Sequence, residues 1–449
     1  MKVITPSDGL VIKESCRFAE GTYVLPHGMR IGSPGIVVDG GGAKLMGVNR
    51  TEIGLTLEGM DGVTLRGLRL SDYAWGIAAR DASEIIVEGC EVSGTAEVAP
   101  NTVFLDIWRT ADDPYGAAIL LDRVHQSRVA GCMLQHQQNG LLTYACRGLK
   151  VVGNHASYNS GFGFHLYGTC DSEFETNCAD YCCRFEPREG GPHFGHMGAD
   201  AAGFVAVYGS CRNVFRNNAA RLGGDGFFLA GLAPDGTPCG CDDNLFEGND
   251  GSLSPNIAFE ATFCRGNVFR NNYADRCNYG FWLGFSWDTL IEGNRMIMNR
   301  QAGIAVENGH GYRVTGNTMQ ANGHGMLLWS VYVAQFAELY PSSLTSYAWE
   351  IVGNTMVRNG KGIRIAADQD HGIRPAAPEG SGRPECRPHH HAILRNDIQD
   401  NRVGIELHAC DHTTIEGNIL HRNVEANIRE EDSTETVKRN NLGSAGGYL

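Results

Sequence analysis

The sequence predicts an all-β fold, a single right-handed parallel β-helix solenoid with loop insertions flanking one sheet. Three observations predict it: an asparagine that recurs every 22 or 23 residues, a glycine-led strand motif in phase with it, and a composition rich in glycine. The 449 residues include 59 Gly and only 20% charged side chains, which favours many turns over long polar helices. Because each repeat packs only on its neighbours, one solenoid accommodates a chain of this length.

The first marker is the pattern apolar-x-Gly/Asn-Asn. Uninterrupted stretches such as Asn249, Asn272 and Asn294 are spaced too tightly for a helical repeat, so we expect short strands bounded by turns. Asparagines stacked at one turn can bond the same groups one rung above and below. The recurring asparagine, which Thr or Arg precedes in two rungs, is Asn154, Asn177, Asn218, Asn249, Asn272, Asn294, Asn317, Asn354, Asn396 and Asn418.

The second marker is a glycine followed by alternating apolar residues. It reads GFHLY, GFFLA, GFWLG, GIAVE, GMLLW, GIRIA and GIELH along the chain. In a strand of this pattern, the first and third residues after the glycine point inward and the intervening ones point outward. The outward positions of successive strands therefore form columns on one face of the solenoid.

The 15 cysteines fit the same repeat. Cys90 and Cys132 occupy the asparagine position in early rungs, and a second shared position follows the glycine-led strand. With no export signal in view, we expect reduced thiols that form an interior ladder. The second position holds Cys146, Cys170, Cys211, Cys264 and Cys410.

Charge and hydropathy restrict the partners. The net charge of −14 argues against nucleic acid, whose binding rests on basic phosphate contacts. The sequence contains no run of about 18 apolar residues, the length that would predict a membrane-spanning helix. The N-terminus, MKVITPSDGLVIKE, lacks the apolar segment of a secretion signal, so we expect a cytoplasmic protein unless a leader was removed.

With these repeats, and with GTYVLPHGMRI and IVVDGGGAKLMG near the start, the chain resembles the pectate-lyase-like superfamily of parallel β-helices. The resemblance implies an N-terminal cap over 1–34, a β-helix over 35–441 and a C-terminal tail over 442–449. It implies a carbohydrate partner, and, because some β-helices assemble as trimers, it leaves a homotrimer open. That superfamily is known for lyases, glycoside hydrolases, epimerases and adhesins, so the fold does not choose the reaction. The DPHD and Asn-Thr-Asp motifs of its epimerases and polygalacturonases are absent, so no catalytic residues are carried over.

Insertions mark one face of the solenoid as the binding face. They fall on both sides of the glycine-led strand, which predicts a walled cleft. Large aromatic residues at outward positions of that strand indicate a binding surface. The insertions lie near 95–115, 183–202, 231–243, 330–348 and 367–391.

The chemistry that we expect first is glycosidic-bond cleavage or intramolecular transfer by paired carboxylates. Outward alternation places Glu260, Gly284 and Glu307 in one column on successive rungs. Two rungs would separate the carboxylates by roughly 9–10 Å, at the upper end of the inverting geometry. Trp282 and Trp329 would then offer ring faces to a sugar, and Phe228 lies on the same strip.

Asp225 in GGDGFF offers an alternative catalytic partner for Glu260 at about one rung, nearer the retaining geometry. His324, in a turn, is a candidate to orient a carboxylate or hydroxyl. The remaining candidates for substrate binding are His165, Tyr167, Asp200 and Arg364.

Two other functions remain open. A polysaccharide lyase or uronate epimerase would need a base and a cation, which Lys361, Arg364, His408 and His165 could supply. A non-catalytic sugar-binding solenoid would need only the aromatics. We expect neither cofactor nor metal, since the cysteine and histidine spacings match no zinc finger and the triplet at 389–391 is typical of a solvated loop.

Overall fold

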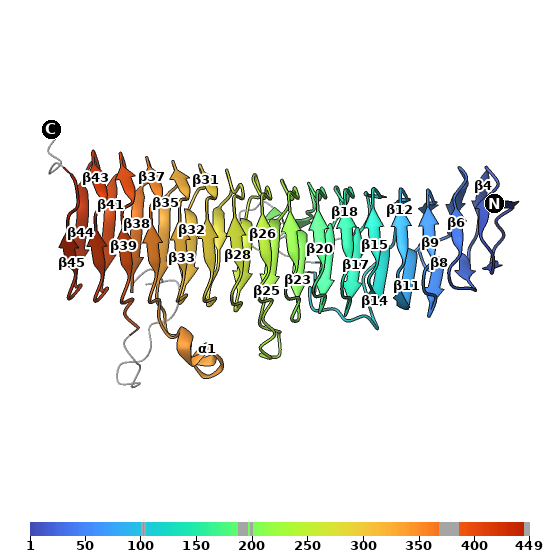
Figure 1. Ribbon diagram of the computed structural model, residues 1–449, viewed down its shortest axis with the longest axis horizontal. Helices are drawn as coiled ribbons and strands as arrows, with labels where there is room; N and C mark the ends of the chain where they lie inside the picture. Colours follow the sequence, from blue (N-terminus) through green and yellow to red (C-terminus); the bar gives the residue numbers. More distant parts are fainter. Residues whose placement is uncertain (100–101, 103–104, 187–195, 198–200, 368–385, 444–449) are drawn as a thin grey trace. The chain divides into compact units, whose positions relative to one another are not determined.

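The computed structural model describes residues 1–99, 102, 105–186, 196–197, 201–367 and 386–443. It divides into two compact units, Met1–Phe228 and Leu229–Leu449, each described by itself. Both are built almost entirely of short parallel strands stacked rung on rung (Figure 1). The all-β solenoid that the repeat predicts is therefore confirmed. Within the described ranges, no helix has the length and apolarity needed to cross a membrane.

Three parallel sheets, A, B and C, line the coil of the first unit. Sheet A contains β1 (Lys2–Ile4), β3 (Cys16–Phe18), β6 (Val37–Asp39), β9 (Thr64–Arg66), β12 (Ile86–Glu88), β15 (Arg128–Ala130), β18 (Lys150–Val152), β20 (Glu173–Glu175) and β24 (Val214–Arg216). Sheet B contains β2 (Val11–Ile12), β5 (Met29–Ile31), β8 (Ile53–Glu58), β11 (Trp75–Ser83), β14 (Ala117–His125), β17 (Leu141–Tyr144), β19 (Phe164–Tyr167), β23 (Ala202–Val207) and β25 (Asp225–Ala230). Sheet C contains β4 (Thr22–Val24), β7 (Lys44–Met46), β10 (Arg69–Ser71), β13 (Glu91–Ser93) and β16 (Met133–Leu134).

The second unit repeats the arrangement. Its sheet A strands are β26 (Leu245–Glu247), β28 (Val268–Arg270), β30 (Leu290–Glu292), β33 (Arg313–Thr315), β36 (Glu350–Val352), β39 (Ala392–Leu394), β42 (Thr414–Glu416) and β45 (Val437–Arg439). Its sheet B strands are β27 (Ile257–Thr262), β29 (Tyr279–Trp282), β32 (Ala302–Glu307), β35 (His324–Trp329), β38 (Lys361–Ala366), β41 (Val403–His408) and β44 (Ala426–Glu431). Its sheet C strands are β31 (Arg295–Ile297), β34 (Thr318–Gln320), β37 (Thr355–Val357), β40 (Asp397–Gln399) and β43 (Ile419–His421).

The asparagine marker forms the predicted ladder. The side-chain oxygen of Asn294 accepts from the backbone N–H and the amide of Asn272, at 2.8 and 2.9 Å, and its own amide donates to Phe269 O and to Asn317. The residue before it, Gly293, has φ +64°, a left-handed conformation that glycine and asparagine tolerate best. That requirement explains why Gly or Asn precedes the ladder asparagine in most rungs. The bonds match because every rung repeats the same turn.

A second asparagine ladder, which the sequence analysis did not identify, closes the neighbouring turn. Its backbone and amide bonds link Asn299, Asn322, Asn359, Asn401 and Asn423. Stacked phenylalanines fill the interior between the sheets. Phe246 and Phe269 stack at 5.0 Å between ring centres, as do Phe259 and Phe281. Stacking keeps both apolar burial and ring geometry favourable at each rung.

The cysteines only partly follow the predicted interior ladder. Cys146, Cys264 and Cys410 are buried, as expected. Cys170 and Cys211 are partly exposed, so their placement in that ladder is wrong. The residues before them, Thr169 and Ser210, occupy the interior position instead. The segment from the glycine-led strand to this interior position is one residue longer in the Cys211 rung than in the Cys170 rung.

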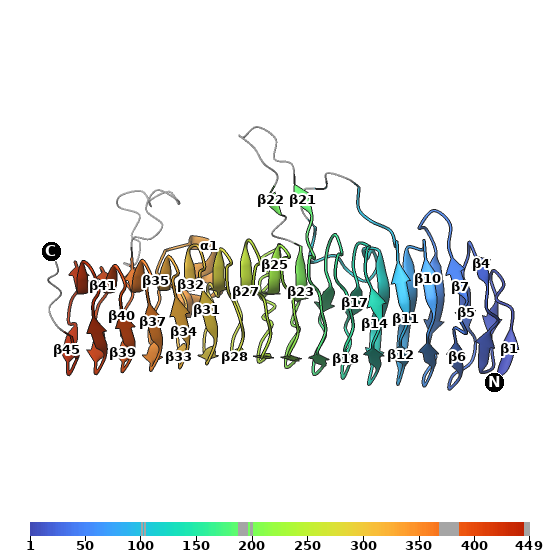
Figure 2. The same ribbon diagram turned by 90° about the horizontal axis from the view of Figure 1, so that it is seen from above.

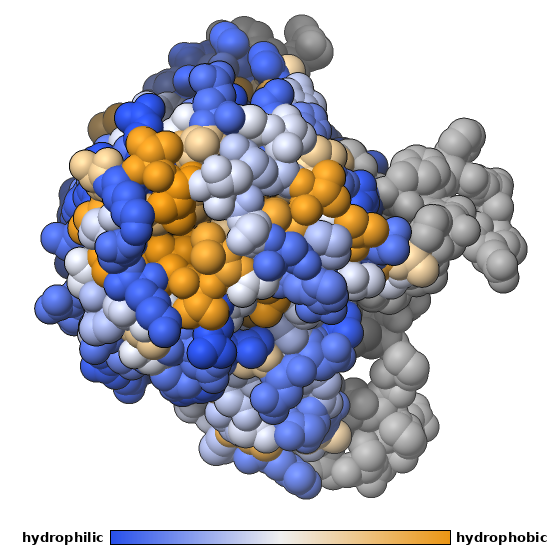
Figure 3. All heavy atoms as spheres, turned by 90° about the vertical axis from the view of Figure 1, so that its right-hand side faces the viewer, coloured by the Kyte–Doolittle hydropathy of each residue, from blue (hydrophilic) through white to orange (hydrophobic). Residues whose placement is uncertain are grey.

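The segment 1–34, expected as a cap, already contributes rungs to the solenoid. β1 pairs with β3, and β2 pairs with β5, in the parallel register of the later rungs. At this end of the first unit, apolar side chains face outward (Figure 3). They include Met1, Val3, Val11 and Val24, all exposed.

The insertions carry the remaining elements. α1 (Ala334–Leu339) and the 3-10 turn η1 (Pro341–Ser343) lie in the insertion after β35, outside the coil of the second unit (Figure 1). In the first unit, β21 (Phe185–Glu186) and β22 (His196–Met197) pair antiparallel in the insertion after β20 and project away from the coil (Figure 2).

Candidate functional site

The outward face of sheet B in the second unit carries two columns of side chains. Strand pairing fixes their register, because each residue lies directly beside its partner on the next rung. The first column is Glu260, Trp282, Ala305, Leu327, Arg364, Glu406 and Arg429. The second column includes Glu307, Trp329, Ala366, His408 and Glu431.

Glu260 lies in the Trp282 column, so the prediction that it shares a column with Glu307 is wrong. Phe259 pairs with Phe281 and stacks on it at 5.0 Å, which aligns the two interior aromatics. The expected alignment paired Glu260 with Gly284, two residues beyond Trp282, its partner in the structure. Two rungs and two residues along the strand place the Cα atoms of the two glutamates roughly 12 Å apart, instead of the 9–10 Å expected.

Gly284 lies between Trp282 and Glu307. A Cβ at this position would be 3.7 Å from Trp282 Nε1 and 3.8 Å from Glu307 Cβ. The missing side chain therefore leaves space for the indole edge to lie beside Glu307. The space beside Gly284 is therefore occupied by the edge of the Trp282 side chain.

The aromatic residues of this face form one cluster. Trp282 packs edge-on against Trp329 at 5.3 Å and against Tyr279 at 4.8 Å between ring centres. Tyr279 and Trp282 are partly exposed, whereas Trp329 is only 2% exposed and packs with Ala305 and Leu327. Trp329 is therefore a buried packing partner of Trp282, and the expectation that it is itself a sugar platform is wrong.

The two glutamates differ in environment. Glu260 is partly exposed, and burial of its carboxyl raises its pKa from 4.5 to about 8. It therefore retains its proton at neutral pH. Glu307 is 4% exposed and lies next to the Trp282–Trp329 pair. Such a pair of carboxyls in an apolar, aromatic setting is suited to acid–base chemistry.

A basic cluster occupies the same face three rungs further along. Lys361, Arg364 and Arg429 contact the carboxylate of Glu406 at 2.5, 3.0 and 3.2 Å. Burial acts to raise the pKa of Glu406, but the three cations outweigh it and hold that pKa below its usual value. Three cations thus contact the carboxylate of Glu406, and one of them, Arg429, also pairs with Glu425 at 2.8 Å.

His324 lies beside Lys361, where β35 pairs with β38. Its Nδ1 is 3.2 Å from Gln301 O, and burial lowers its pKa, with further lowering by Lys361 and Arg364. The imidazole is therefore neutral at physiological pH. His408 is farther along the second column, 3.4 Å from the carboxylate of Glu431.

Two insertions meet at the ends of β27 and β29 in the second unit. Phe336 of α1 packs edge-on against Phe263 and Phe285, each at 4.8 Å between ring centres. Tyr340 packs on Phe263, and its hydroxyl donates to Gly231 O at 3.4 Å, in the segment leading to the 231–243 insertion. These contacts anchor the α1 insertion beside the aromatic face.

In the first unit, His165 anchors the 95–115 insertion to the coil. It is 2% exposed, and its Nε2 is 2.9 Å from Ile107 O in the 95–115 insertion. Burial lowers its pKa to about 4, so the ring is neutral. The expected contact between His165 and substrate is therefore wrong. Tyr167 is partly exposed and stacks on Tyr208 at 4.6 Å.

The remaining predicted residues of the first unit are dispersed. Asp225 is the first residue of β25, is 1% exposed, and donates its N–H to Ala201 O at 3.0 Å. Phe228 is partly exposed on the same strand. Asp200 lies outside the described residues.

No three His, Cys, Asp or Glu side chains are grouped to hold a metal ion in the part of the chain that the structure describes. The histidine triplet differs from the solvated loop that we expected. His389 stacks on Tyr347 at 5.2 Å, and His391 is 1% exposed, with its pKa lowered by burial to about 3.

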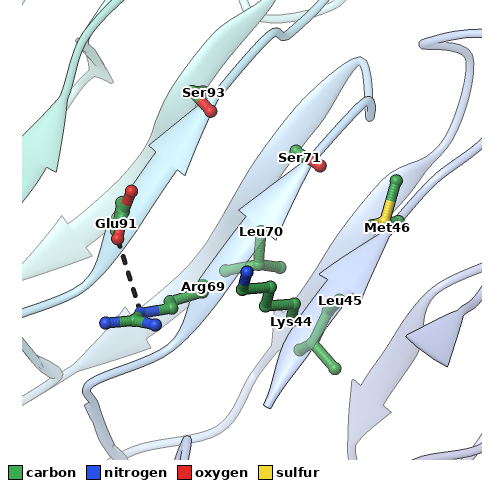
Figure 4. A pocket seen from close by; sticks show the side chains of 8 residues that line it. All are labelled: Lys44, Leu45, Met46, Arg69, Leu70, Ser71, Glu91 and Ser93. Atoms are coloured by element: carbon green, nitrogen blue, oxygen red, sulfur yellow. Dashed lines mark ion pairs between the residues drawn. The ribbon is translucent and has the colours of Figure 1, made fainter. Parts of the chain in front are cut away.

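A separate hollow lies over sheet C of the first unit (Figure 4). Arg69 and Glu91 form an exposed ion pair across it at 3.4 Å, while Leu45 and Leu70 point into the core. The groups around it carry no buried acid or aromatic platform. Its lining is Lys44, Leu45, Met46, Arg69, Leu70, Ser71, Glu91 and Ser93.

The family model described as "right handed beta helix region" matches residues 9–218 and 101–254, which together span more than half of the chain. The chain belongs to the right-handed β-helix family. This membership confirms the handedness that the sequence predicts. A second model, described as "periplasmic copper-binding protein (NosD)", matches residues 196–370 of this β-helix.

Solved structures share the coil at low identity. The Dettilon tailspike protein gp208 is 13% identical with a TM-score of 0.45, and the match covers 70% of this chain and 62% of the tailspike. The A-module of the mannuronan C-5 epimerase AlgE6 from Azotobacter vinelandii is 12% identical (TM-score 0.39; 97% and 92% covered). The α-1,3-glucanase of family GH87 from Streptomyces thermodiastaticus is 11% identical (TM-score 0.45; 94% and 64% covered). No curated protein matches the sequence.

Sequence reasoning missed two residues of the β-helix face. Tyr279 precedes the glycine of GFWLG and was not considered an outward position. Arg429 lies one rung beyond Glu406, and extending the same column to NIREE would have found it.

Proposed function

We propose that this β-helix is a carbohydrate-active enzyme that cleaves, or transfers intramolecularly, a glycosidic bond on sheet B of the second unit, with Glu260 as proton donor. The observation that carries the proposal is a carboxyl with a pKa of about 8 beside a partly exposed tryptophan. A carboxylic acid that stays protonated at neutral pH can protonate the leaving oxygen of a glycoside.

Trp282 and Tyr279 supply the sugar-binding surface. Sugar rings bury their apolar faces against aromatic rings, and both side chains are partly exposed beside Glu260. The oligo- or polysaccharide would run along the columns, across successive rungs. Trp329 would hold Trp282 in place through their edge-on contact.

Glu307 would act as the second carboxylate. The Cα atoms are roughly 12 Å apart, and side chains that lean toward each other over that span leave room for a water between the carboxyls, the inverting arrangement with about 6.5–9.5 Å between carboxyl groups. In an intramolecular transfer, a hydroxyl of the substrate would replace that water.

The test is turnover of labelled oligosaccharides, with products identified by mass. Glu260→Gln removes the acidic proton without changing the shape of the side chain, and should lower kcat by about 10²- to 10⁴-fold. Glu307→Gln tests the second carboxylate, and Glu338→Gln on exposed α1 is the matched control. If turnover survives both substitutions, these glutamates are not the catalytic pair; an added water in the product indicates hydrolysis and an isomer indicates transfer.

The basic cluster favours a second candidate, a polysaccharide lyase or uronate epimerase. Lys361 and Arg364, with side chains 16% and 13% exposed, would neutralise a uronate carboxylate, and neutral His324 would remove the adjacent proton. An unsaturated uronate, detected by its ultraviolet absorbance, would support the lyase. A glycan that binds without any product would support the sugar-binding solenoid instead.

A further inference from the structure

Two cysteines on neighbouring rungs of the first unit lie at the same turn position. Cys170 follows β19 and Cys211 follows β23, and these strands pair in parallel. Immediately before them, the N–H of Thr169 donates to Ser210 Oγ at 3.1 Å, which fixes the alignment of the two turns. Cys170 and Cys211 are therefore stacked one above the other.

The two residues contact each other directly. The N–H of Cys211 donates to Cys170 Sγ at 3.4 Å, and the N–H of Asp171 donates to Cys211 O at 3.1 Å. Rungs are roughly 4.8 Å apart, within the Cα–Cα range of about 4.4–6.8 Å that a disulfide spans. Both cysteines are partly exposed, so reagents in solution can reach them.

Two arginines and one carboxylate lie beside this pair. Arg212 forms a two-pronged ion pair with Asp171 at 2.7 and 3.1 Å, and Arg147 is 3.0 Å from the same carboxylate. The Cys211 side chain, its backbone N–H and Arg212 lower the pKa of the Cys170 thiol to about 6. Burial instead raises the pKa of Cys178 and Cys183, two other partly exposed thiols of this unit. Cys170 is therefore a thiolate at neutral pH.

We propose that Cys170 and Cys211 form a dithiol site that reacts with small-molecule disulfides such as oxidised glutathione and closes into a disulfide between neighbouring rungs. The Cys170 thiolate attacks one sulfur of the small disulfide, forming a mixed disulfide and releasing one thiolate. The Cys211 thiol then loses its proton and attacks Cys170 Sγ, which releases the second small thiol. Two protein thiols are oxidised, and one small disulfide is reduced to two thiols.

Closure would link two rungs that an insertion separates in the sequence. The two cysteines are 41 residues apart in sequence, and the segment between them contains the 183–202 insertion. The stacked Tyr167–Tyr208 pair lies three residues before the cysteines on the same two rungs. A disulfide here would close that segment into a covalent loop and would join the two turns that follow the stacked tyrosines.

The experiment exposes the reduced full chain to oxidised glutathione at pH 7, blocks remaining thiols with iodoacetamide under denaturing conditions, and maps cysteines by mass spectrometry. We expect a cross-linked Cys170–Cys211 peptide in the wild type and a trapped glutathione on Cys170 in C211S. Cys90 and Cys132 are the matched control, because they are stacked on neighbouring rungs but buried. They should remain reduced.

Two results would overturn the proposal. One is that, in the wild type, oxidised glutathione modifies other thiols while Cys170 and Cys211 are each recovered in the alkylated form, without a cross-link. The other is oxidation of Cys90–Cys132 at an equal rate. A second measurement needs no variant: the alkylation rate of native Cys170 should level off above about pH 7, whereas that of Cys178 continues to rise. If the two rates follow the same pH profile, Cys170 is not activated.

Discussion

Replacing Glu260 with glutamine should stabilise the protein in alkaline solution. In the folded chain, burial holds the pKa of Glu260 at about 8, whereas the unfolded chain ionises it near 4.5. Below pH 4.5 both states carry the proton, and the carboxyl has no effect on the pH dependence. Between 4.5 and 8 the unfolded state loses the proton first, so stability falls as pH rises.

The size of the effect follows from the shift. A difference of about 3.5 pKa units corresponds to an upper limit of roughly 5 kcal/mol, at about 1.36 kcal/mol per unit. Because Glu260 is partly exposed, solvent screening reduces this to about 2–4 kcal/mol. Glutamine stays neutral at every pH, so the variant should match the wild type at pH 4 and exceed it by that amount above pH 8.

Urea unfolding followed by tryptophan fluorescence measures the difference, since Trp282 and Trp329 report on the rungs around Glu260. The free energy of unfolding is compared between wild type and Glu260→Gln from pH 4 to 9. Glu338→Gln, on the exposed side of α1, should show no pH-dependent difference. A Glu260→Gln effect that is equal at pH 4 and pH 9 would show that the carboxyl is ionised in the folded protein.

Three further outcomes follow from the same contacts. Trp282→Ala should raise KM for an oligosaccharide substrate by about 2- to 12-fold through lost stacking; an unchanged KM in initial-rate assays would remove Trp282 from the site. Asn294→Ala should lower the free energy of urea unfolding by about 2–4 kcal/mol, because it leaves buried partners of its ladder unbonded; a loss below about 0.5 kcal/mol would contradict this. His165→Ala should speed tryptic cleavage within 95–115, since the contact with Ile107 O is lost; equal cleavage rates would contradict the anchoring role.

The sequence predicted the repeat because its physical cause is local. The asparagine ladder needs a left-handed residue followed by an amide in each rung, and both requirements are visible as letters, as at Gly293–Asn294. The column of Glu260 was not visible in this way. Ile257, Phe259 and Ala261 alternate along β27, so a two-residue shift keeps every side chain on its own face. Contacts between the rungs, such as the stacking of Phe259 on Phe281, select the register.

Burial of the candidate residues depends on parts of the chain that no periodic pattern places. The 95–115 insertion covers His165, and the aromatic cluster buries Trp329, although both residues occupy outward positions of their strands. The ion pair between Arg429 and Glu406, by contrast, follows from the strand pattern, because the two residues occupy the same outward position on neighbouring rungs. A strand pattern predicts which way a side chain points, and neighbouring loops decide what it meets.

The asparagine ladder also bears on how such a protein can change length during evolution. Each ladder asparagine accepts bonds from the rung before it and donates to the rung after it, so one rung presents the same connection on both sides. A whole rung can therefore be duplicated or deleted without leaving an unmatched amide in the core. Each such event would lengthen or shorten the outward columns of sheet B by roughly 4.8 Å. Binding subsites can thus be gained or lost by recombination of rungs, while the residues that line the remaining ones are preserved.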